Sequence, residues 1–476
     1  MQRERRVHAF VIVIISCFIL SVVSAHFASH DAYAAEKPRV IVLTDISNEP
    51  DDEESMVRYL VYSNEFDTEA LIATTSVWLR DETREDLIRR QINAFGKVRA
   101  NLIKHADGYP AIDDLLAVTT TGQSGFGMDD VGFGKSTDGS KLIIDIIDKP
   151  DDRPVWVTAW GGANTLAQAL WDVKYSRTPE ELAAFVSKLR VYTISDQDNS
   201  GRWMRITFPG LFFIVTPSEV GSKEYYKATW TGISGDRINK NGAYHYFELV
   251  DNPWLIENII ENHGPLGALY PRLEYLMEGD TPSYIGLINN GLGSAVSPSY
   301  GGWGGRYELM QSYAETRPIW TNSRDTVTAL DGSTHTTAQA TIWRWRDQYQ
   351  YDFAARMDWC VAERYQDANH NPAAVLNGSG GKDIVEMTVK SGETVNLSAD
   401  GSSDPDGDTL EISWFKYKEA GTLRRDIELS NDSGSKTSFT APKTDRAQTL
   451  HVILAVKDDG EPNLTSYRRA IITVTK

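Results

Sequence analysis

Cysteine is scarce in this sequence. Of the 476 residues only Cys17 and Cys360 are cysteines, and Cys17 lies in an apolar segment close to the N-terminus. If that segment is removed, the chain cannot form an internal disulfide, so its stability must come from a hydrophobic core, for which its length is ample. The sequence also lacks a set of cysteines and histidines spaced as zinc ligands. We therefore expect neither a disulfide scaffold nor a zinc site.

Positive charge is also in short supply. Lysine and arginine together number 48 against 66 aspartates and glutamates, which gives a net charge of −18. Without residues 1–34, which carry three basic and two acidic residues, the net charge becomes −19. Because such a surface repels phosphate backbones and anionic lipids, we expect no nucleic acid and no anionic membrane as a partner. A neutral carbohydrate or glycoside is compatible with this charge.

The first 34 residues have the pattern of a signal peptide. A basic start, MQRERR, is followed by the apolar run VHAFVIVIISCFILSVVSA and by small-residue sites at VSA and AYA. The apolar run is near membrane-spanning length, so an uncleaved anchor is the alternative. With cleavage near Ala35, the sequence predicts a secreted or periplasmic protein that has no stable membrane insertion.

Residues 35–376 have the pattern of an α/β domain. Near-continuous apolar runs, typical of parallel strands buried on both faces, alternate with amphipathic stretches typical of helices. The predicted strands are residues 39–46, 69–78, 154–161, 190–196 and 211–217, and the predicted helices are residues 51–63, 81–102, 164–173, 178–189 and a long one at about 337–365. This alternation predicts a mainly parallel sheet with helices on both faces.

The pattern changes after NGSGGK, residues 377–382, which we interpret as a flexible linker. From residue 383 to residue 476 the chain alternates with period two, is rich in Thr, Val and Ile, and has turn residues about every ten positions. These features are typical of an Ig-like β-sandwich domain.

Acidic residues are concentrated where the first predicted strand ends. The stretch VIVLTDISNEPDDEES contains Asp45, Glu49, Asp51, Asp52, Glu53 and Glu54. One explanation is a helix start, because acids in a first turn complement the helix macrodipole. That explanation does not cover Asp45, which interrupts a buried strand end. Buried carboxylates that converge need a cation, and an all-oxygen set favours Ca²⁺ or Mg²⁺.

The same stretch resembles the N-terminal signature of nucleoside hydrolases, whose acids hold a Ca²⁺ that activates a water. TAWGGANTLAQAL resembles the segment of that family in which a backbone carbonyl binds the metal, and MEGDTPSYIGLI resembles the segment whose aspartate completes the site. The resemblance implies a nucleoside-hydrolase-like α/β fold. It also implies Ca²⁺ ligands at Asp45, Asp51, Asp52, the Asn164 carbonyl and Asp280. In this scheme Asp45 is the catalytic base and Asp51 also contacts the substrate.

A second resemblance extends over nearly the whole mature chain. The stretches TDI…EPDD, SDQDNSG, GDTPS and GGWGGRY are similar to those of exported nucleoside hydrolase-like proteins described as cellulose-binding. SDQDNSGRW follows a predicted strand, so its polar side chains and its Trp are expected to contact a sugar. The candidate substrate-binding residues are Asp196, Asp198, Asn199, Trp203, Trp303 and Arg306. The alternatives are an ordinary Asp/Asn turn and internal packing of Trp303.

Several positions depart from nucleoside hydrolases. Leu43 stands where that family has its first aspartate, and two extra residues separate Asp45 from Asp51. Gly279 replaces a histidine that assists the leaving group in some members, and Trp78 lies where a ribose-contacting asparagine is expected. We therefore expect the metal site to be kept and a nucleoside not to be the substrate.

A second calcium site is possible in the sandwich. Asp404, Asp406 and Asp408 alternate in DGSSDPDGDTL, which resembles polycystic-kidney-disease-type and cadherin-like repeats. A turn rich in Asp and Gly is the alternative.

Two functions remain open from the sequence. The first is an exported enzyme that hydrolyses an N- or O-glycosyl bond with a calcium-activated water. The second is a non-catalytic protein that binds cellulose or another polysaccharide. The oligomeric state is left open.

Overall fold

The computed structural model describes residues 36–476 except residues 48, 237–242 and 313. The signal peptide predicted at residues 1–34 lies outside the described residues. Pro38–Lys476 forms one compact unit. Across the described residues, no helix combines the length and the apolar character that are needed to cross a bilayer.

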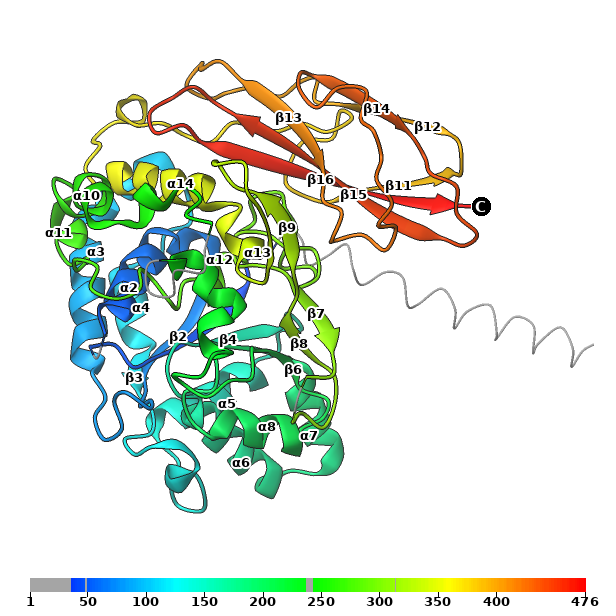
Figure 1. Cartoon of the computed structure of the whole chain (residues 1–476). Helices are drawn as coiled ribbons and strands as arrows, with labels where there is room; N and C mark the ends of the chain where they lie inside the picture. The colour runs from blue at the N-terminus through cyan, green and yellow to red at the C-terminus, as the bar shows by residue number, and fades with distance from the viewer. Residues whose placement is uncertain (1–35, 48, 237–242, 313) are drawn as a thin grey trace, which may run out of the picture. The chain divides into compact units, whose positions relative to one another are not determined.

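A mainly parallel sheet forms the centre of the first part of the chain (Figure 1). Within the described residues it has eight strands in the order β3-β2-β1-β4-β5-β6-β8-β7. These are β1 (Arg39–Thr44), β2 (Asp67–Ala73), β3 (Thr119–Thr121), β4 (Val155–Ala159), β5 (Leu189–Thr193), β6 (Phe212–Ile214), β7 (Tyr307–Met310) and β8 (Ile319–Asn322). Only the pair β7 and β8 is antiparallel. The predicted α/β sheet is confirmed.

Helices cover both faces of this sheet. The longer ones are α2 (Pro50–Val61), α3 (Glu85–His105), α5 (Asp138–Asp148), α6 (Asn164–Ser176), α7 (Pro179–Ser187), α8 (Ser200–Thr207) and α14 (Arg346–Trp359), and the short ones are α4 (Ile112–Ala117), α10 (Asn252–Leu255), α11 (Gly264–Gly267), α12 (Pro282–Ile285) and α13 (Ala340–Trp343). Val40 and Val42 of β1 pack in one core with α2, α3 and α14. Ile41 and Leu43 pack in a second core with α5, α6, α7 and α8. Because both faces of β1 are buried, its sequence is almost entirely apolar.

The strand order reverses next to β1. The chain runs from β1 to β2 and β3 on one side, and β4, β5 and β6 follow on the other side. In open α/β sheets, ligands bind outside the carboxyl ends of the strands at such a reversal. Asp45, after β1, and Gly161, after β4, lie at this point.

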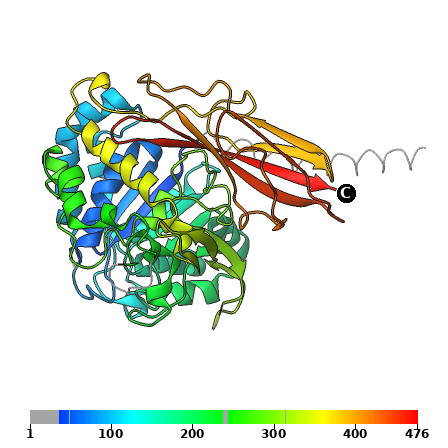
Figure 2. The same ribbon diagram turned by 45° about the horizontal axis from the view of Figure 1, so that its top comes forward.

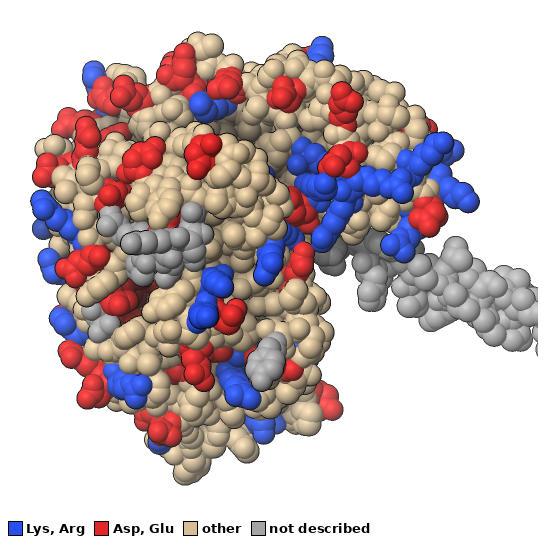
Figure 3. All heavy atoms as spheres, viewed as in Figure 1, with Lys and Arg blue, Asp and Glu red and all other residues tan. Residues whose placement is uncertain are grey.

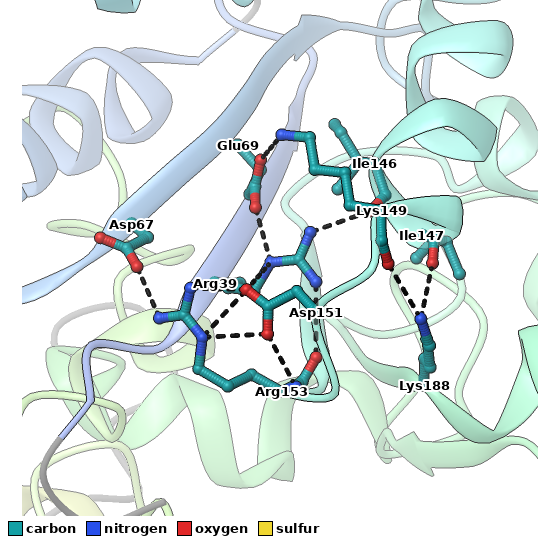
Figure 4. A network of polar contacts seen from close by, with 9 residues as sticks. All are labelled: Arg39, Asp67, Glu69, Ile146, Ile147, Lys149, Asp151, Arg153 and Lys188. Atoms are coloured by element: carbon teal, nitrogen blue, oxygen red, sulfur yellow. Dashed lines mark hydrogen bonds and ion pairs between the residues drawn. The ribbon is translucent and has the colours of Figure 1, made fainter.

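The opposite end of β1 is held by ion pairs (Figure 4). Arg39 is fully buried, and its Nε lies 2.6 Å from Oε1 of Glu69. Arg153 approaches Asp67 to 2.6 Å and Asp151 to 2.7 Å. The acids at this end of the sheet therefore have basic partners.

The prediction of one long helix at about 337–365 is wrong in its extent. The chain forms α13 and α14 instead, and Trp345 between them has φ −110° and ψ 13°, outside the helical range. Its ring packs against Phe415, Tyr417 and Tyr467 of the C-terminal part. This contact is distant in sequence, so the helical periodicity could not indicate it.

The C-terminal part is a β-sandwich, which confirms that prediction. Its sheets have the orders β11-β16-β15-β13 and β12-β14, and β9 and β10 form a separate hairpin. The strands are β9 (Asp325–Thr328), β10 (Thr334–Thr337), β11 (Val385–Lys390), β12 (Thr394–Ser398), β13 (Glu411–Lys416), β14 (Lys436–Thr440), β15 (Gln448–Lys457) and β16 (Thr465–Thr475). Figure 2 shows β15 and β16 as long neighbouring strands, which pair antiparallel. Trp414, Leu454 and Ile472 belong to a hydrophobic core within the sandwich. The domain boundaries at 377–382 stay a prediction.

An arginine of the sandwich binds a loop of the α/β part. Arg469 of β16 is fully buried, and its guanidinium donates to the carbonyls of Leu292 at 2.5 Å and of Tyr300 and Gly301 at 3.0 Å each. One side chain thus binds three carbonyls, and losing it would leave the buried carbonyls of Leu292 and Gly301 without this donor.

Gly291 permits the close contact between the sandwich and the α/β part, and replacing this glycine tests that contact. Its φ is +93°, and a Cβ there would overlap the carbonyl of Tyr467. We expect Gly291→Ala to lower the free energy of unfolding by about 3 kcal/mol or more, from backbone strain plus overpacking. Gly392→Ala is the control, because Gly392 has φ +86° with open space around it. It should cost only about 1–2 kcal/mol in the same urea titration; equal losses would contradict the junction contact.

Candidate functional site

Three carboxylates from two distant segments meet beyond the carboxyl end of β1. Asp51, Asp52 and Asp280 each offer an oxygen, and these oxygens all lie within 4.8 Å of one another. Asp52 and Asp280 are buried and Asp51 is half-buried. Asp51 and Asp52 belong to the first turn of α2, whereas Asp280 lies just before α12. The structure thus brings together three of the predicted ligands; that they hold a metal stays a prediction.

Asp45, which was also predicted as a ligand, lies beside this group, and its role as a ligand stays a prediction. Asp45 is buried, and its Oδ2 accepts a hydrogen bond from the Ser76 hydroxyl, in the loop after β2. Gly161 lies so close to Asp45 that a Cβ there would overlap the carboxylate. The reversal of strand order therefore places the loops after β1, β2 and β4 around one acid.

These acids surround a small cavity, which we call the acid chamber. Its volume is about 20 Å³, enough for roughly one water-sized occupant. It is lined by Asp45, Glu49, Asp51, Asp52, Trp78, Ile194, Gln197, Tyr225, Trp230 and Asp280. All ten are described residues, and no lysine, arginine or histidine is among them. The overall acidic excess, in contrast, is spread over the visible face rather than gathered in one patch (Figure 3).

The pKa values of the carboxyl groups in the chamber are raised, as expected for buried acids that lack a basic partner. Burial raises the pKa of Asp45 to about 6, against the lowering effect of its bond from Ser76. Burial, followed by repulsion from Asp45 and Asp51, raises the pKa of Asp52 well above its usual range. Burial and repulsion from Asp52 do the same to the pKa of Asp280. Such raised pKa values at one site are typical of functional carboxylates.

The donor set fits a hard divalent cation. The converging atoms are all carboxylate oxygens, which Ca²⁺ and Mg²⁺ prefer. Oδ2 of Asp280 is buried and accepts no hydrogen bond from any described residue. A bound cation would give this oxygen its missing partner and remove the repulsion among the acids.

A buried ion pair holds the two halves of the site together. Arg58 of α2 and Glu278, two residues before Asp280, are both fully buried and pair through Nε and Oε2. Arg58 also donates to the Tyr349 carbonyl at 2.9 Å, and its guanidinium lies 3.9 Å from the ring centre of Phe353. The pair therefore ties α2 to α14 and to the segment that carries Asp280.

Glycine at position 279 is required by the acid beside it. A Cβ on Gly279 would lie 2.6 Å from Oδ2 of Asp51 and 3.3 Å from the ring of Trp230. The histidine that the nucleoside hydrolase resemblance places here would therefore displace Asp51. This departure from the family pattern has a steric reason.

Asn164, Asp198 and Asn199 form a polar cluster beside the chamber. The amide of Asn164 donates to the Gly125 carbonyl at 2.7 Å, and Asp198 accepts from the backbone of Ser200 at 2.8 Å. Asn199 Oδ1 accepts from the backbone of Met128 at 2.8 Å. None of these three residues lines the acid chamber, so the Asn164 carbonyl as a ligand and the other two as substrate contacts stay predictions.

Asp196 and Trp203 have local partners. Arg205 pairs with Asp196 at 2.8 Å and with Glu315 at 2.8 Å. Trp203 packs edge-on against Phe208, beside the second sheet core. These contacts are internal to the fold, and they give no support to a sugar-binding role.

Trp303 and Arg306 lie at the junction with the sandwich and do not line the chamber. Trp303 is buried in the hydrophobic core, which corresponds to the packing alternative. Arg306 Nε lies 2.7 Å from Asp325, which also accepts from the Tyr417 hydroxyl at 2.6 Å. We therefore leave both residues out of the proposed site.

The Asp-rich loop of the sandwich is a hydrogen-bonded turn. Asp404 Oδ1 accepts from the backbone of Asp406, Gly407 and Asp408 at 2.8, 2.9 and 3.1 Å. Asp406 accepts from His370. In the described chain these three acids are not grouped as Asp51, Asp52 and Asp280 are. A second calcium ion at Asp404, Asp406 and Asp408 stays a prediction.

Two aromatic residues of the chamber were not predicted. Tyr225 and Trp230 come from 3₁₀ turns at Tyr225–Lys227 and Thr229–Ile233. Their rings pack edge to face with centres 5.1 Å apart, and the Trp230 indole donates to Ser195 at 3.0 Å. The surrounding sequence, KEYYKATWTG, has neither helix nor strand periodicity, so it offered no signal.

Comparison with known protein families identifies the two parts of the chain. Residues 39–307 match the family model described as "Cellulose-binding Sde182, nucleoside hydrolase-like domain". The chain belongs to this family. Residues 394–474 match the C-terminal domain of the cellulose-binding protein Sde0182. No curated protein matches the sequence.

One solved structure is similar over most of the chain. It is a nucleoside hydrolase-related hypothetical protein from Saccharophagus degradans, described as associated with carbohydrate metabolism. The identity is 37%, the TM-score is 0.80, and the match covers 92% of this chain and 100% of that one.

Two further structures are much less similar. The PKD domain of the KIAA 1837 protein is 22% identical, with 19% of this chain and 79% of that one covered and a TM-score of 0.15. The type III effector XopQ, complexed with adenosine diphosphate ribose, is 12% identical, with 60% and 88% covered and a TM-score of 0.29. Such scores support no conclusion about this chain.

The ion pair under the site can be tested by a double-mutant cycle. We expect Arg58→Met to lower the free energy of unfolding by about 3–5 kcal/mol, because Glu278 would stay buried without its partner. Adding Glu278→Gln should recover a large part of that loss, since no uncompensated charge remains. Urea denaturation of the four proteins measures this. Strictly additive losses would show that the two side chains do not interact.

Proposed function

We propose that this chain is an exported enzyme that hydrolyses a glycosidic bond with the help of a bound calcium ion. The observation that supports this most is the convergence of Asp51, Asp52 and Asp280 without a basic residue in the chamber. Pure sugar binding does not need such a costly group of buried acids, whereas a metal site does. The likeness to a protein associated with carbohydrate metabolism points to a glycoside as the substrate.

The side chains of the chamber have separate roles in this proposal. A calcium ion held by Asp51, Asp52 and Asp280 would lower the pKa of a bound water and make it nucleophilic. Asp45 accepts the proton of that water, and its pKa of about 6 suits a general base that works near neutral pH. Ser76 orients this carboxylate. The remaining negative charge of the acids stabilises an oxocarbenium-like transition state.

Tyr225 is positioned to act on the leaving group. Its hydroxyl keeps its proton, because burial and repulsion from Asp51 and Glu49 raise its pKa well above the usual range. A protonated phenol can donate a hydrogen bond to the departing oxygen or nitrogen. This would replace the histidine for which Gly279 leaves no room.

A non-catalytic carbohydrate-binding protein is the second candidate. It is favoured by the description of the matched family as cellulose-binding. The two candidates differ in turnover. We expect the secreted chain to hydrolyse at least one member of a panel of nucleosides, aryl glycosides and oligosaccharides, and to lose this activity with a chelator. Retention on cellulose without any turnover would support the second candidate.

The variant Asp52→Asn distinguishes two explanations for the acids at the start of α2, a metal site and an ordinary helix start. In calorimetric titration we expect calcium to bind the wild type and to bind this variant at least about 100-fold more weakly, because a charged ligand is lost. Calcium should also raise the melting temperature of the wild type only.

The control for that variant is Asp114→Asn. Asp114 is an exposed acid in the first turn of α4, so it has a helix-start role and no acidic neighbourhood of this kind. It should bind calcium like the wild type. Equal calcium affinity in Asp52→Asn and the wild type would refute the metal site.

The apparent calcium affinity should depend on pH. A carboxyl must lose its proton to bind the metal, and burial together with repulsion from neighbouring acids raises the pKa values of Asp51, Asp52 and Asp280 well above normal. Protons therefore compete increasingly with calcium for these three carboxylates as the pH falls. We expect weaker calcium binding at pH 5 than at pH 7.5, with proton release on binding. Titrations in buffers of different ionisation enthalpy measure both, and a pH-independent affinity would contradict this scheme.

A further inference from the structure

A second and larger cavity adjoins the acid chamber, and we call it the aromatic cleft. Its volume is about 200 Å³, ten times that of the chamber. The two cavities share Glu49, Asp51, Trp78, Tyr225 and Trp230. The cleft adds the aromatic residues Tyr226 and Tyr275. The acids thus adjoin a space in which five of the ten lining residues are aromatic.

Three of these aromatic side chains are exposed to an unusual degree. The exposed fractions are 45% for Trp78, 39% for Tyr226 and 55% for Tyr275. Large aromatic residues usually bury most of their surface, so three exposed rings around one cavity indicate a surface that a ligand covers. Aromatic faces of this kind bind flat, weakly polar ring faces, while their hydroxyl groups bind polar edges.

Trp78 is connected to the proposed catalytic base. The Ser76 hydroxyl that donates to Asp45 also accepts from the backbone of Trp78 at 3.0 Å and of Leu79 at 3.2 Å. The turn that orients Asp45 therefore also places the Trp78 ring at the mouth of the chamber. A ring stacked on Trp78 would have its edge next to the acids.

The chamber and the cleft differ in what they can hold. With a volume of about 20 Å³, the chamber is too small for a sugar ring, whereas the adjoining cleft of about 200 Å³ has room for one. In this scheme the ring lies in the aromatic cleft, with its reacting carbon towards the shared border at Glu49 and Asp51. Glu49 and Asp51 line both cavities, and no lysine, arginine or histidine is among the described residues that line either of them, so this border is negative. It would attract hydroxyl donors and repel carboxylates and phosphates.

We propose that the aromatic cleft binds a neutral sugar ring of a glycan, stacked on Trp78 and Tyr275, and that the acids at its border exclude uronic acids and sugar phosphates. This inference rests on the proposed function, because it assigns the substrate class of the same site. It predicts that neutral oligosaccharides are bound and that nucleotides and uronate-containing oligosaccharides are not.

The test measures binding rather than turnover. The full secreted chain, loaded with calcium, is titrated by calorimetry with cellotetraose, xylotetraose and mannotetraose as neutral probes, and with tetragalacturonate as the acidic probe. We expect at least one neutral probe to bind at least tenfold more tightly than tetragalacturonate. Trp78→Ala should weaken that binding roughly tenfold or more, the size typical of lost aromatic stacking. Tyr275→Ala should weaken it in the same direction.

Two controls make the result specific. Tyr175→Ala removes an exposed aromatic ring, 65% exposed, on α6 and outside the lining of the cleft, and should bind the sugar like the wild type. Calcium affinity should be unchanged in Trp78→Ala, because alanine keeps the backbone N–H that bonds to Ser76. That result shows that the variant is folded at the site.

The outcomes distinguish this proposal from the hydrolase. If sugar binding depends on Trp78 but no turnover is observed, the sugar-binding cleft is supported and the proposed hydrolysis is refuted. If turnover is sensitive to a chelator but Trp78→Ala binds the sugar as tightly as the wild type, the proposed hydrolysis is supported and the sugar-binding role of the cleft is refuted. Equal affinity for the neutral and acidic probes, or no binding of any neutral probe, also overturns it.

Discussion

The repulsion among buried carboxylates at the end of β1 is the constraint on which this site depends. Asp51, Asp52 and Asp280 hold oxygens within 4.8 Å of one another, although burial raises the free energy of every charge among them. The fold opposes this repulsion with a pair placed underneath, Arg58 with Glu278, both fully buried. That pair joins the segment before α12 to α2, the two segments that carry the acids. Converging buried acids of this kind cost stability and are typical of functional sites, which is the physical basis of the function proposed above.

The two ends of β1 show the difference between structural and functional acids. At the amino end, Glu69 and Asp67 face Arg39 and Arg153, and each charge has a partner about 2.6 Å away. At the carboxyl end, the acid chamber has no basic lining residue among the described residues. The acids at the amino end of β1 are therefore paired with basic residues, whereas the acids at its carboxyl end are not. The uncompensated side is the one at which strand order reverses, which is where ligands bind in open α/β sheets.

The fold was largely predictable, and the site only partly so. The strands β1, β4 and β5 are near-continuous apolar runs because two cores bury them, and Asp45 is conspicuous because it ends such a run. Tyr225 and Trp230 lie in short 3₁₀ turns with no periodicity, so their place in the chamber depends on tertiary folding alone. Trp303 and Arg306 come from a glycine-rich loop that is typical of a binding site, yet Tyr417 of the sandwich packs on this loop and donates to Asp325, the partner of Arg306. Contacts between segments a hundred residues apart leave no local pattern, and the break at Trp345 has the same cause.

The departures from nucleoside hydrolases follow from one another. Gly279 is small because Asp51 and Trp230 occupy the space that a histidine side chain would need. Without that histidine, the proposed hydrolysis needs a donor for the leaving group from a different segment, and Tyr225 lines the same chamber as the acids. Trp78, which stands where a ribose contact is expected, supplies an exposed ring in place of an amide. The converging acids Asp51, Asp52 and Asp280 and the exposed rings of Trp78 and Tyr275 lie on different segments of the chain, so the second set can change while the first is kept. The proposed function depends on this separation, because it assigns the acids to a cation and the rings to the sugar.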